Sequence, residues 1–467
     1  MQGNESIHFV GIGGAGMSAI AVVLLAKGMP VSGSDLKESR NTRRLQQMGA
    51  RIFIGHRAEN IKDADILVAS SAIPERNREI AQARELGLEV IPRAAMLNMI
   101  MDEGKGIAVA GTHGKTTTTS MIAMIMREAG LDPTYVIGGE LNDVGSNAHA
   151  GSGEYVIAEA DESDGSFLLL HPWAEVITNV EEDHLDFFRD GEEVREYFRR
   201  FVYLLPPGGM LVFAGDDPGA AGLRHHSAGR EVSFGEGEQN DFSSLEVSLF
   251  PGGSIFQVYH SGKHLGEIKL GIPGEHNVRN AMAALALTLS IGVDFEDASR
   301  ALGGFRGVQR RYQNMGEVAG IRLIDDYAHH PSEVLTTLKA AAMEDAGRLV
   351  CIFQPHRYSR TAALWEGFGS ALLLADLVIV TDVYAAGEDP LPGVNGKLIV
   401  NALLDADPAK QVVYIPKRSQ VGNAAASFLR AGDLVLTMGA GDITQCAAEI
   451  AGILNRESDE ACGPRER

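Results

Sequence analysis

One arrangement recurs along this chain of 467 residues: an apolar run typical of a β-strand, a polar or glycine-rich loop, and then a helical stretch. It occurs first where Ile7–Val10 runs into Gly11–Gly16, and again where Ile107–Ala110 runs into Gly111–Thr116. From about Tyr312 onward, apolar strands again alternate with helical stretches. Strands that alternate with helices predict parallel sheets covered by helices. We therefore expect an α/β protein.

The length of the chain indicates more than one domain, because a single hydrophobic core does not extend over so many residues, and two to four domains are expected. The pattern changes between about Ser243 and Gly271, where alternating runs are broken at Pro251–Gly253 and at Ser261–Lys263. Such turns predict antiparallel hairpins. A helix is expected from about Glu275, and the tail after about Arg456 is expected to be disordered.

Charge and composition exclude several classes of protein. The formal net charge of −21 argues against a nucleic-acid-binding protein and against stable association with a membrane surface. The chain has no signal-peptide pattern, and its longest apolar run, Ala371–Val380, is interrupted by Asp376 and too short to cross a bilayer. We therefore expect a cytoplasmic protein. The widely spaced cysteines predict neither a zinc site nor a disulfide framework; they are Cys351, Cys446 and Cys462.

The first glycine-rich loop has the spacing of a nucleotide-binding loop. Gly11, Gly13 and Gly16 follow an apolar strand and open a helix, and Asp35 stands about twenty residues later at the end of a second strand. Glycines allow the backbone to approach a pyrophosphate, and the acid can accept hydrogen bonds from a ribose. By itself this pattern predicts NAD as the ligand, with a tight strand–helix turn as the alternative.

The second loop is more specific. Gly114, Lys115 and Thr116, between a strand and a helix, form the core of an ATP-binding loop, in which the lysine neutralises phosphate and the hydroxyl binds Mg²⁺. The usual spacing would require a glycine where Val109 stands; Gly111 gives a shorter form of the loop. ATP binding is favoured over a purely structural loop.

Acidic side chains that could complete a magnesium site follow the next two strands. Glu159 begins an acidic stretch that continues to Asp164, and Asp183 and His184 follow the strand predicted at Val176–Asn179. One or two of these acids are expected to bind the metal, and the others to form a solvated turn. A histidine in this setting is often a helix cap or a surface residue. Along the chain, the ATP-binding loop is followed by a strand that ends in acids and then by a strand that ends in a histidine. This order favours a role for the histidine as a metal ligand instead.

Taken together with further motifs, these loops resemble those of the Mur ligase family, and the resemblance covers nearly the full length of the chain. The resemblance rests on seven motifs in the family's order: His8–Ser18, Gly111–Thr117, Glu159–Asp164 with Asp183–His184, Gly274–Asn280, Asp325–Pro331, Gln354–Arg360, and Gly439–Asp442. It is closest to the branch that joins L-alanine to UDP-N-acetylmuramic acid.

The resemblance implies a three-domain Mur ligase architecture. A Rossmann-like domain at 1–104 would bind the UDP-sugar rather than NAD. A central P-loop ATPase-like domain with a small antiparallel sheet is expected at 105–311, and a Rossmann-like domain at 312–467. The implied reaction is ATP- and Mg²⁺-dependent ligation of L-alanine to the carboxylate of UDP-N-acetylmuramic acid through an acyl phosphate. The enzyme would be a monomer or a homodimer.

The resemblance also implies roles for individual residues. The catalytic set would be Lys115, Glu159, His184, Arg311 and Asp326, with Thr116, Glu159 and His184 holding Mg²⁺. ATP would meet Gly111, Thr112, His113, Gly114, Lys115, Thr116, Thr117, His276, Asn277 and Asn280. The other substrates would meet Gly13, Gly14, Ala15, Gly16, Asp35, His56, Tyr327, His329, His356, Arg357 and Arg360.

Four alternatives remain at this stage. Two belong to the same fold: the recycling ligase that attaches a tripeptide to UDP-N-acetylmuramic acid, and folylpolyglutamate synthase. The glycine-rich stretch at Gly11–Ser18 argues against both. An NAD-dependent dehydrogenase would leave the phosphate loop and the acidic strand ends unexplained. A protein that senses nucleotides without turning them over would bind ATP and release no phosphate.

Overall fold

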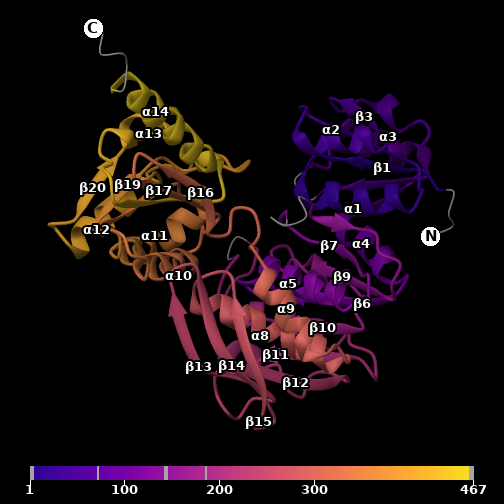
Figure 1. Ribbon diagram of the computed structural model, residues 1–467. Coiled ribbons are helices and arrows are strands. Elements are labelled where there is room, and N and C mark those ends of the chain that lie inside the picture. The colour runs from indigo at the N-terminus through magenta and orange to yellow at the C-terminus, as the bar shows by residue number, and fades with distance from the viewer. Residues whose placement is uncertain (1–4, 71–72, 141–145, 185–186, 462–467) are drawn as a thin grey trace, which may run out of the picture. The chain divides into compact units, whose positions relative to one another are not determined.

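The computed structural model describes residues 5–70, 73–140, 146–184 and 187–461 (Figure 1). These residues form two compact units. One comprises 1–247, 255–270 and 277–306, and the other comprises 248–254, 271–276 and 307–467. The described residues form three sheets. No helix in the described part of the chain is both long enough and apolar enough to cross a bilayer.

The first sheet is parallel throughout, as the strand–helix alternation predicts. Its strands lie in the order β3-β2-β1-β4-β5, so the chain leaves β1 toward one edge and later returns to its other side. The strands are β1 (Ile7–Val10), β2 (Val31–Asp35), β3 (Arg51–Ile54), β4 (Ile66–Ala69) and β5 (Glu89–Pro92). The helices are α1 (Ala15–Ala26), α2 (Arg40–Gln47), α3 (Arg78–Leu86) and α4 (Arg93–Met101), with a 3-10 turn at Ala58–Ile61. Ligand-binding loops of such sheets follow the carboxyl ends of the strands, beside the point where the strand order reverses.

The second sheet joins a parallel core to a ribbon of hairpins. Its order is β15-β14-β13-β12-β11-β10-β6-β9-β7-β8. The strands are β6 (Lys105–Ala110), β7 (Thr134–Val136), β8 (Ala148–His149), β9 (Tyr155–Glu159), β10 (Ala174–Ile177), β11 (Met210–Ala214), β12 (Arg230–Gly235), β13 (Phe242–Phe250), β14 (Gly253–His260) and β15 (Lys263–Leu270). The helices are α5 (Lys115–Glu128), α6 (Gly191–Val202), α7 (Pro218–Ala221), α8 (Glu275–Ser290) and α9 (Phe295–Gly304), with a 3-10 turn at Ser166–Leu169. The hairpins are confirmed, because β13, β14 and β15 are neighbours joined by turns too short for any other arrangement.

The third sheet has the order β16-β17-β21-β18-β19-β20 and is parallel except for the edge strand β16. Its strands are β16 (Gln313–Val318), β17 (Ile321–Asp326), β18 (Arg348–Phe353), β19 (Leu377–Val380), β20 (Gln411–Tyr414) and β21 (Asp433–Met438). The helices are α10 (Pro331–Ala342), α11 (Tyr358–Leu372), α12 (Lys397–Ala406), α13 (Arg418–Ala426) and α14 (Gln445–Ala461), with a 3-10 turn at Asp442–Thr444.

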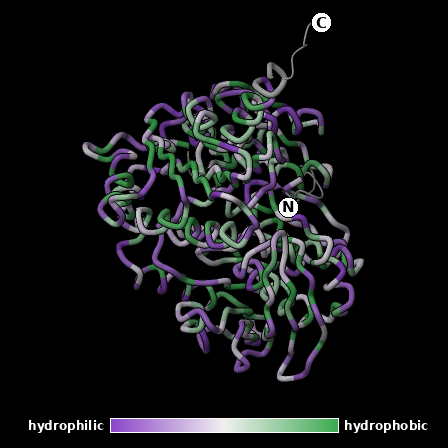
Figure 2. The backbone as a smooth tube through the Cα atoms, turned by 60° about the vertical axis from the view of Figure 1, so that its left-hand side comes forward, coloured by the Kyte–Doolittle hydropathy of each residue, from purple (hydrophilic) through white to green (hydrophobic). Residues whose placement is uncertain are grey.

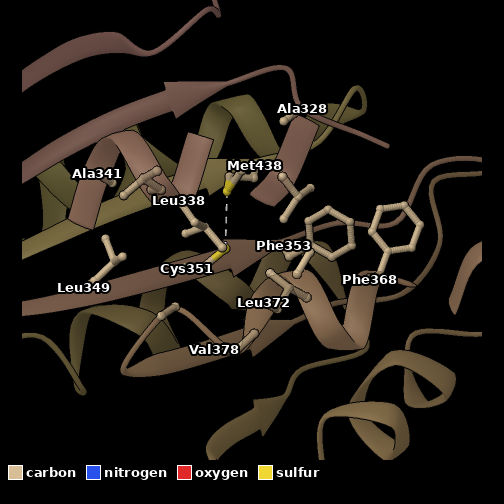
Figure 3. Close-up of a cluster of buried hydrophobic side chains, with 14 of the residues drawn as sticks. Ala328, Leu338, Ala341, Leu349, Cys351, Phe353, Phe368, Leu372, Val378 and Met438 are labelled. Carbon is tan, nitrogen blue, oxygen red and sulfur yellow. Dashed lines mark hydrogen bonds between the residues drawn. The ribbon is translucent and has the colours of Figure 1, made fainter. Parts of the chain in front are cut away.

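Two apolar clusters pack on the faces of this third sheet. Helices α10, α11 and α12 contribute to one, and α13 and α14 to the other. The strands between them carry mostly hydrophobic residues (Figure 2). Figure 3 shows the first cluster, where the Sγ atom of Cys351 lies 3.4 Å from the Sδ atom of Met438. Cys351 and Cys446 are buried free thiols, and Cys462 lies outside the described residues.

The C-terminal tail and the end of β10 differ from the sequence prediction. The prediction of a disordered tail after Arg456 is wrong as far as Ala461, because α14 continues to that residue. Strand β10 ends at Ile177 rather than Asn179. The side chains of Thr178 and Asn179 instead form hydrogen bonds with the loop between β6 and α5.

Candidate active site

The loop between β6 and α5 has a backbone that requires glycine. Gly111 has a φ of +135° and Gly114 a φ of +83°, both in the region that side chains disfavour. A Cβ atom on Gly114 would lie 2.3 Å from Oδ1 of Asn280. The two glycines therefore allow a tight loop that passes close to α8 before α5 begins at Lys115.

Lys115 lies inside this loop. Its Nζ atom donates to the carbonyl oxygens of Gly111 (2.6 Å) and Thr112 (3.1 Å) and forms an ion pair with Oε1 of Glu162 (2.8 Å). Burial lowers the pKa of this ammonium group, but Glu162 and neighbouring carboxylates outweigh burial and raise the pKa above its ordinary value. The lysine is therefore charged and held where the loop would receive phosphate.

Oxygen donors for a divalent cation gather beside the loop. Thr116 Oγ1 donates to Glu159 Oε1 at 2.9 Å, and Glu159 Oε2 accepts from the backbone N–H of Gly138 at 2.8 Å. His184 Nε2 lies 3.4 Å from Glu162 Oε1. The second oxygen of Glu162 is buried and has no hydrogen-bond partner among the described residues. A hydroxyl and two carboxylates are ligands that Mg²⁺ prefers, so these residues fit that ion.

The segment after β10 forms hydrogen bonds with the loop between β6 and α5, the predicted phosphate loop. Thr178 Oγ1 donates to the carbonyl oxygen of His113 at 2.5 Å, and Asn179 exchanges hydrogen bonds with the backbone of His113 at 2.9 and 3.0 Å. The same segment continues to His184, whose φ of +56° is unusual for a residue with a side chain. Backbone strain of this kind occurs often at functional sites.

Helix α8 brings two of the predicted ATP contacts to the phosphate loop. Asn277 and Asn280 are buried and hydrogen-bonded to each other at 3.3 Å, and Asn280 also lies 3.4 Å from Thr118 Oγ1 on α5. His276, the third predicted contact, lies in the first turn of α8.

The glycine-rich loop after β1 is tied to the end of β2. The backbone N–H of Gly13 donates to Oδ2 of Asp35 at 2.9 Å, and a Cβ atom on Gly13 would lie only 2.7 Å from that oxygen. The structure therefore brings the predicted residues Gly13 and Asp35 together. His56 follows β3, and its Nδ1 atom lies 2.9 Å from Ser34 Oγ and 3.1 Å from Glu79 Oε2.

In the other unit, Tyr327 lies close to two arginines. The guanidinium groups of Arg310 and Arg311 lie 4.8 and 5.3 Å from the centroid of its ring. Arg310 also donates to the carbonyl oxygen of Gly439 at 2.6 Å. The carboxylate of Asp326 accepts from the backbone N–H groups of Tyr312 and Ala328, each at 2.7 Å. Burial raises the pKa of Asp326 to about 6, although Arg311 opposes this.

Two histidines meet in this unit, one after β17 and one after β18, although β21 lies between these strands in the sheet. The rings of His329 and His356 are 5.9 Å apart, and His356 stacks on Tyr384 at 5.7 Å. Burial lowers the pKa of His329 to about 4 and that of His356 to about 3, and the charge of Arg360 acts in the same direction on both. Both imidazoles are therefore neutral at pH 7.

Helix α11 begins beside His356. Arg357 is its N-cap residue, with a φ of +66°. Glu388 accepts hydrogen bonds from the backbone N–H groups of Tyr358 (2.6 Å) and Ser359 (3.0 Å) and from the hydroxyl of Ser359 (2.6 Å). This carboxylate therefore fixes the turn that carries Arg357 and Arg360.

The sequence prediction missed several of these side chains. Glu162 was noted only as one of several acids, and Arg310, Glu79 and Glu388 were not selected. Each acts through a partner far away in sequence, so no local motif marks it. Arg310 could have been selected from the sequence only because it adjoins Arg311, which was predicted as a site residue.

Models of one protein family match most of the chain. A model of the Mur ligase family catalytic domain matches residues 6–105, one of the Mur ligase middle domain matches 109–288, and one of the Mur ligase glutamate ligase domain matches 310–441. The chain belongs to the Mur ligase family. The three-domain α/β fold expected from the sequence is thereby confirmed.

Individual Mur ligases resemble the whole chain. A UDP-N-acetylmuramate–L-alanine ligase from Pelotomaculum thermopropionicum is 48% identical, with 96% of this chain and 98% of that protein covered. One of the same name from Rubrobacter xylanophilus is 47% identical, with 95% and 99% covered. The crystal structure of a UDP-N-acetylmuramate–alanine ligase from Thermotoga maritima has a TM-score of 0.83 at 32% identity, with 97% of this chain and 100% of that chain covered. A murein peptide ligase from Psychrobacter arcticus has a TM-score of 0.73 at 25% identity, with 97% and 99% covered.

Proposed function

We propose that this Mur ligase joins L-alanine to the carboxylate of UDP-N-acetylmuramic acid and consumes ATP. The observation that carries the proposal is the convergence of Lys115, Thr116, Glu159 and His184 on one loop. The substrate assignment is supported by the relatives of that activity, which are more similar to this chain than the murein peptide ligase is.

The chemistry requires activation of the acid. A carboxylate is a poor electrophile, so an amine does not displace its oxygen unaided. Attack of the carboxylate on the γ-phosphoryl group of ATP would give an acyl phosphate and ADP. The amine of alanine would then displace phosphate and form the amide.

The first step brings two anions together, so neutralisation of charge should dominate catalysis. Lys115 would hold the β/γ-phosphates with its ammonium group. Thr116, Glu159 and His184 would hold Mg²⁺, which would neutralise phosphate charge. The buried free oxygen of Glu162 places a further carboxylate beside this set.

Further residues would bind the other substrates. Gly13–Gly16, Asp35 and His56 would bind the uridine diphosphate. Arg357 and Arg360, on the turn fixed by Glu388, would position anionic groups, because a guanidinium binds carboxylate or phosphate with two parallel hydrogen bonds. The neutral His329 and His356 can accept hydrogen bonds near Tyr327, where the amino acid is expected.

Phosphate release tests the proposal. The purified protein would receive ATP, Mg²⁺ and UDP-N-acetylmuramic acid, with L-alanine or an L-alanyl tripeptide added in separate reactions. We expect release that requires both the sugar nucleotide and L-alanine, and a loss of more than about 100-fold in Lys115→Ala, since removal of one preorganised charge has effects of that order. Release only with the tripeptide would identify a recycling ligase. Release with neither amine would refute ligation.

A further inference from the structure

A buried carboxylate lies beneath His56. Glu79, in the first turn of α3, is fully inaccessible to solvent. Its Oε1 atom accepts from Asn60 Nδ2 at 2.5 Å and from the backbone N–H of Arg57 at 3.4 Å. Its Oε2 atom accepts from Ser34 Oγ at 2.5 Å and lies 3.1 Å from His56 Nδ1. Burial raises the pKa of a carboxyl group, but the contacts with His8, Ser34 and Asn60 outweigh it and lower that of Glu79 to about 2.

These contacts determine which nitrogen of His56 carries the proton. An ionised carboxylate can only accept hydrogen bonds, and the single hydroxyl proton of Ser34 is donated to Glu79. Nδ1 of His56 is 2.9 Å from Ser34 Oγ and 3.1 Å from Glu79, so either partner must accept from it. Nδ1 is therefore protonated. Nε2, which forms no hydrogen bond within the described part of the chain, retains its lone pair in the neutral ring.

The position of His56 in the sheet indicates what this lone pair would meet. The loops after β1, β2 and β3 lie along one edge, because these strands are adjacent and parallel. In sheets of this kind the pyrophosphate lies at the loop after the first strand and the ribose near the acid that ends the second, here Asp35. The base of a nucleotide bound in this way extends toward β3, after which His56 stands.

We propose that Glu79 and Ser34 hold His56 as the Nδ1–H tautomer, so that its Nε2 accepts a hydrogen bond from the N3–H group of uracil. This inference rests on the proposed binding of a uridine nucleotide by the first domain. Cytosine presents an acceptor at N3 and would place two lone pairs against each other. Glu79 is thus a positioning residue: it sets the preference for uracil without touching the base.

The variant Glu79→Gln tests this assignment. Asn60 and the N–H of Arg57 donate to the Oε1 position, so they hold the amide oxygen of glutamine there and turn its NH₂ group toward His56. Nδ1 then becomes an acceptor and Nε2 carries the proton. The imidazole would now repel the N3–H of uracil and suit the N3 of cytosine.

The measurement is competition of UDP and of CDP against the sugar nucleotide. In the wild-type enzyme we expect CDP to bind about tenfold more weakly than UDP, or weaker still, as one mispaired hydrogen bond predicts. In Glu79→Gln, binding of UDP should weaken while that of CDP does not, so the ratio falls toward one. Asn77→Ala is the matched control, because Asn77 caps the same helix through the backbone N–H of Glu79 and leaves the carboxylate intact; its ratio should be that of the wild type.

Two outcomes would overturn the inference. One is an unchanged UDP-to-CDP ratio in folded Glu79→Gln. The other is a protonated Nε2 on His56 of the wild-type enzyme at mildly alkaline pH, read from the ¹⁵N spectrum of the imidazole, a measurement that does not depend on folding of the variant. An enzyme that releases phosphate with UDP-N-acetylmuramic acid and L-alanine yet gives either result would retain the proposed function. Failure of that wild-type turnover would refute the proposed function itself.

Discussion

The carboxyl group of Glu175 should make this protein less stable as the pH rises. Glu175 lies in the middle of β10, between Ala108 of β6 and Leu211 of β11. Its side chain is fully buried, and within the part of the chain that the structure describes neither oxygen has a hydrogen-bond partner. Burial raises the pKa of this carboxyl group well above its ordinary value. The folded protein therefore keeps a proton that the unfolded chain releases above about pH 4.3.

The magnitude follows from this difference in bound protons. Unfolding releases one proton from Glu175, so its contribution to the free energy of unfolding falls by about 1.4 kcal/mol for each pH unit. The decline begins near the pKa of the unfolded chain and ends at the raised pKa of the folded protein. Glu175→Gln has no proton to release. Relative to the wild type, the variant should therefore gain about 3 kcal/mol over two pH units within that range.

Chemical denaturation at several pH values would measure this gain. The chain has two tryptophans, so in a Trp365→Phe background Trp173, two residues before Glu175, is the sole tryptophan reporter. Other titrating groups cancel when each variant is compared with its parent at the same pH. A stability difference that stays constant with pH would refute the reasoning, because the carboxyl group would then titrate alike in both states.

Three further predictions concern the sites. Gly114→Ala should abolish ATP binding measured by calorimetry, because the new Cβ atom would collide with Asn280. The control Gly252→Ala changes a glycine with a similar φ and open space around it, so this variant should bind ATP normally. Equal ATP affinities of the two variants would contradict the prediction. Glu388→Ala removes the acceptor of the N–H groups in the first turn of α11. It should raise KM for UDP-N-acetylmuramic acid or L-alanine by about tenfold. Steady-state kinetics in which both KM values are unchanged would show that Glu388 does not position the substrate-binding turn. Burial raises the pKa of Asp326 to about 6. The wild type should therefore lose stability relative to Asp326→Asn by up to about 3 kcal/mol as the pH rises from about 4 to 6. Urea denaturation that gives the same difference in unfolding free energy between the two proteins at every pH would disprove this.

Local patterns predicted the elements of the fold well. β1 has the predicted bounds, and the turns between β13, β14 and β15 stand at the predicted Pro251–Gly253 and Ser261–Lys263. These features are visible in sequence because hydrophobic periodicity and turn residues act over a few positions. The phosphate loop was equally visible, since its glycines are required by the backbone angles of the loop itself.

Contacts between distant residues could not be predicted in the same way. Lys115 and Glu162 are 47 positions apart, and nothing local distinguishes Glu162 from the neighbouring acids. The end of β10 was misplaced because Thr178 and Asn179 suit a strand as well as a loop, and only their bonds to His113 decide between them. Resemblance to a family supplied residue roles, but it did not reveal the network around Glu79.

The short segment after β10 has a thermodynamic consequence. Thr178 and Asn179 hold the backbone of the phosphate loop, and His184 stands five residues after Asn179 on the same stretch of chain. A ligand that orders this stretch at one end reduces the conformational entropy that the chain loses when a second ligand binds at the other end. Nucleotide and metal ion should therefore bind with positive cooperativity, and each should raise the affinity for the other by the same factor.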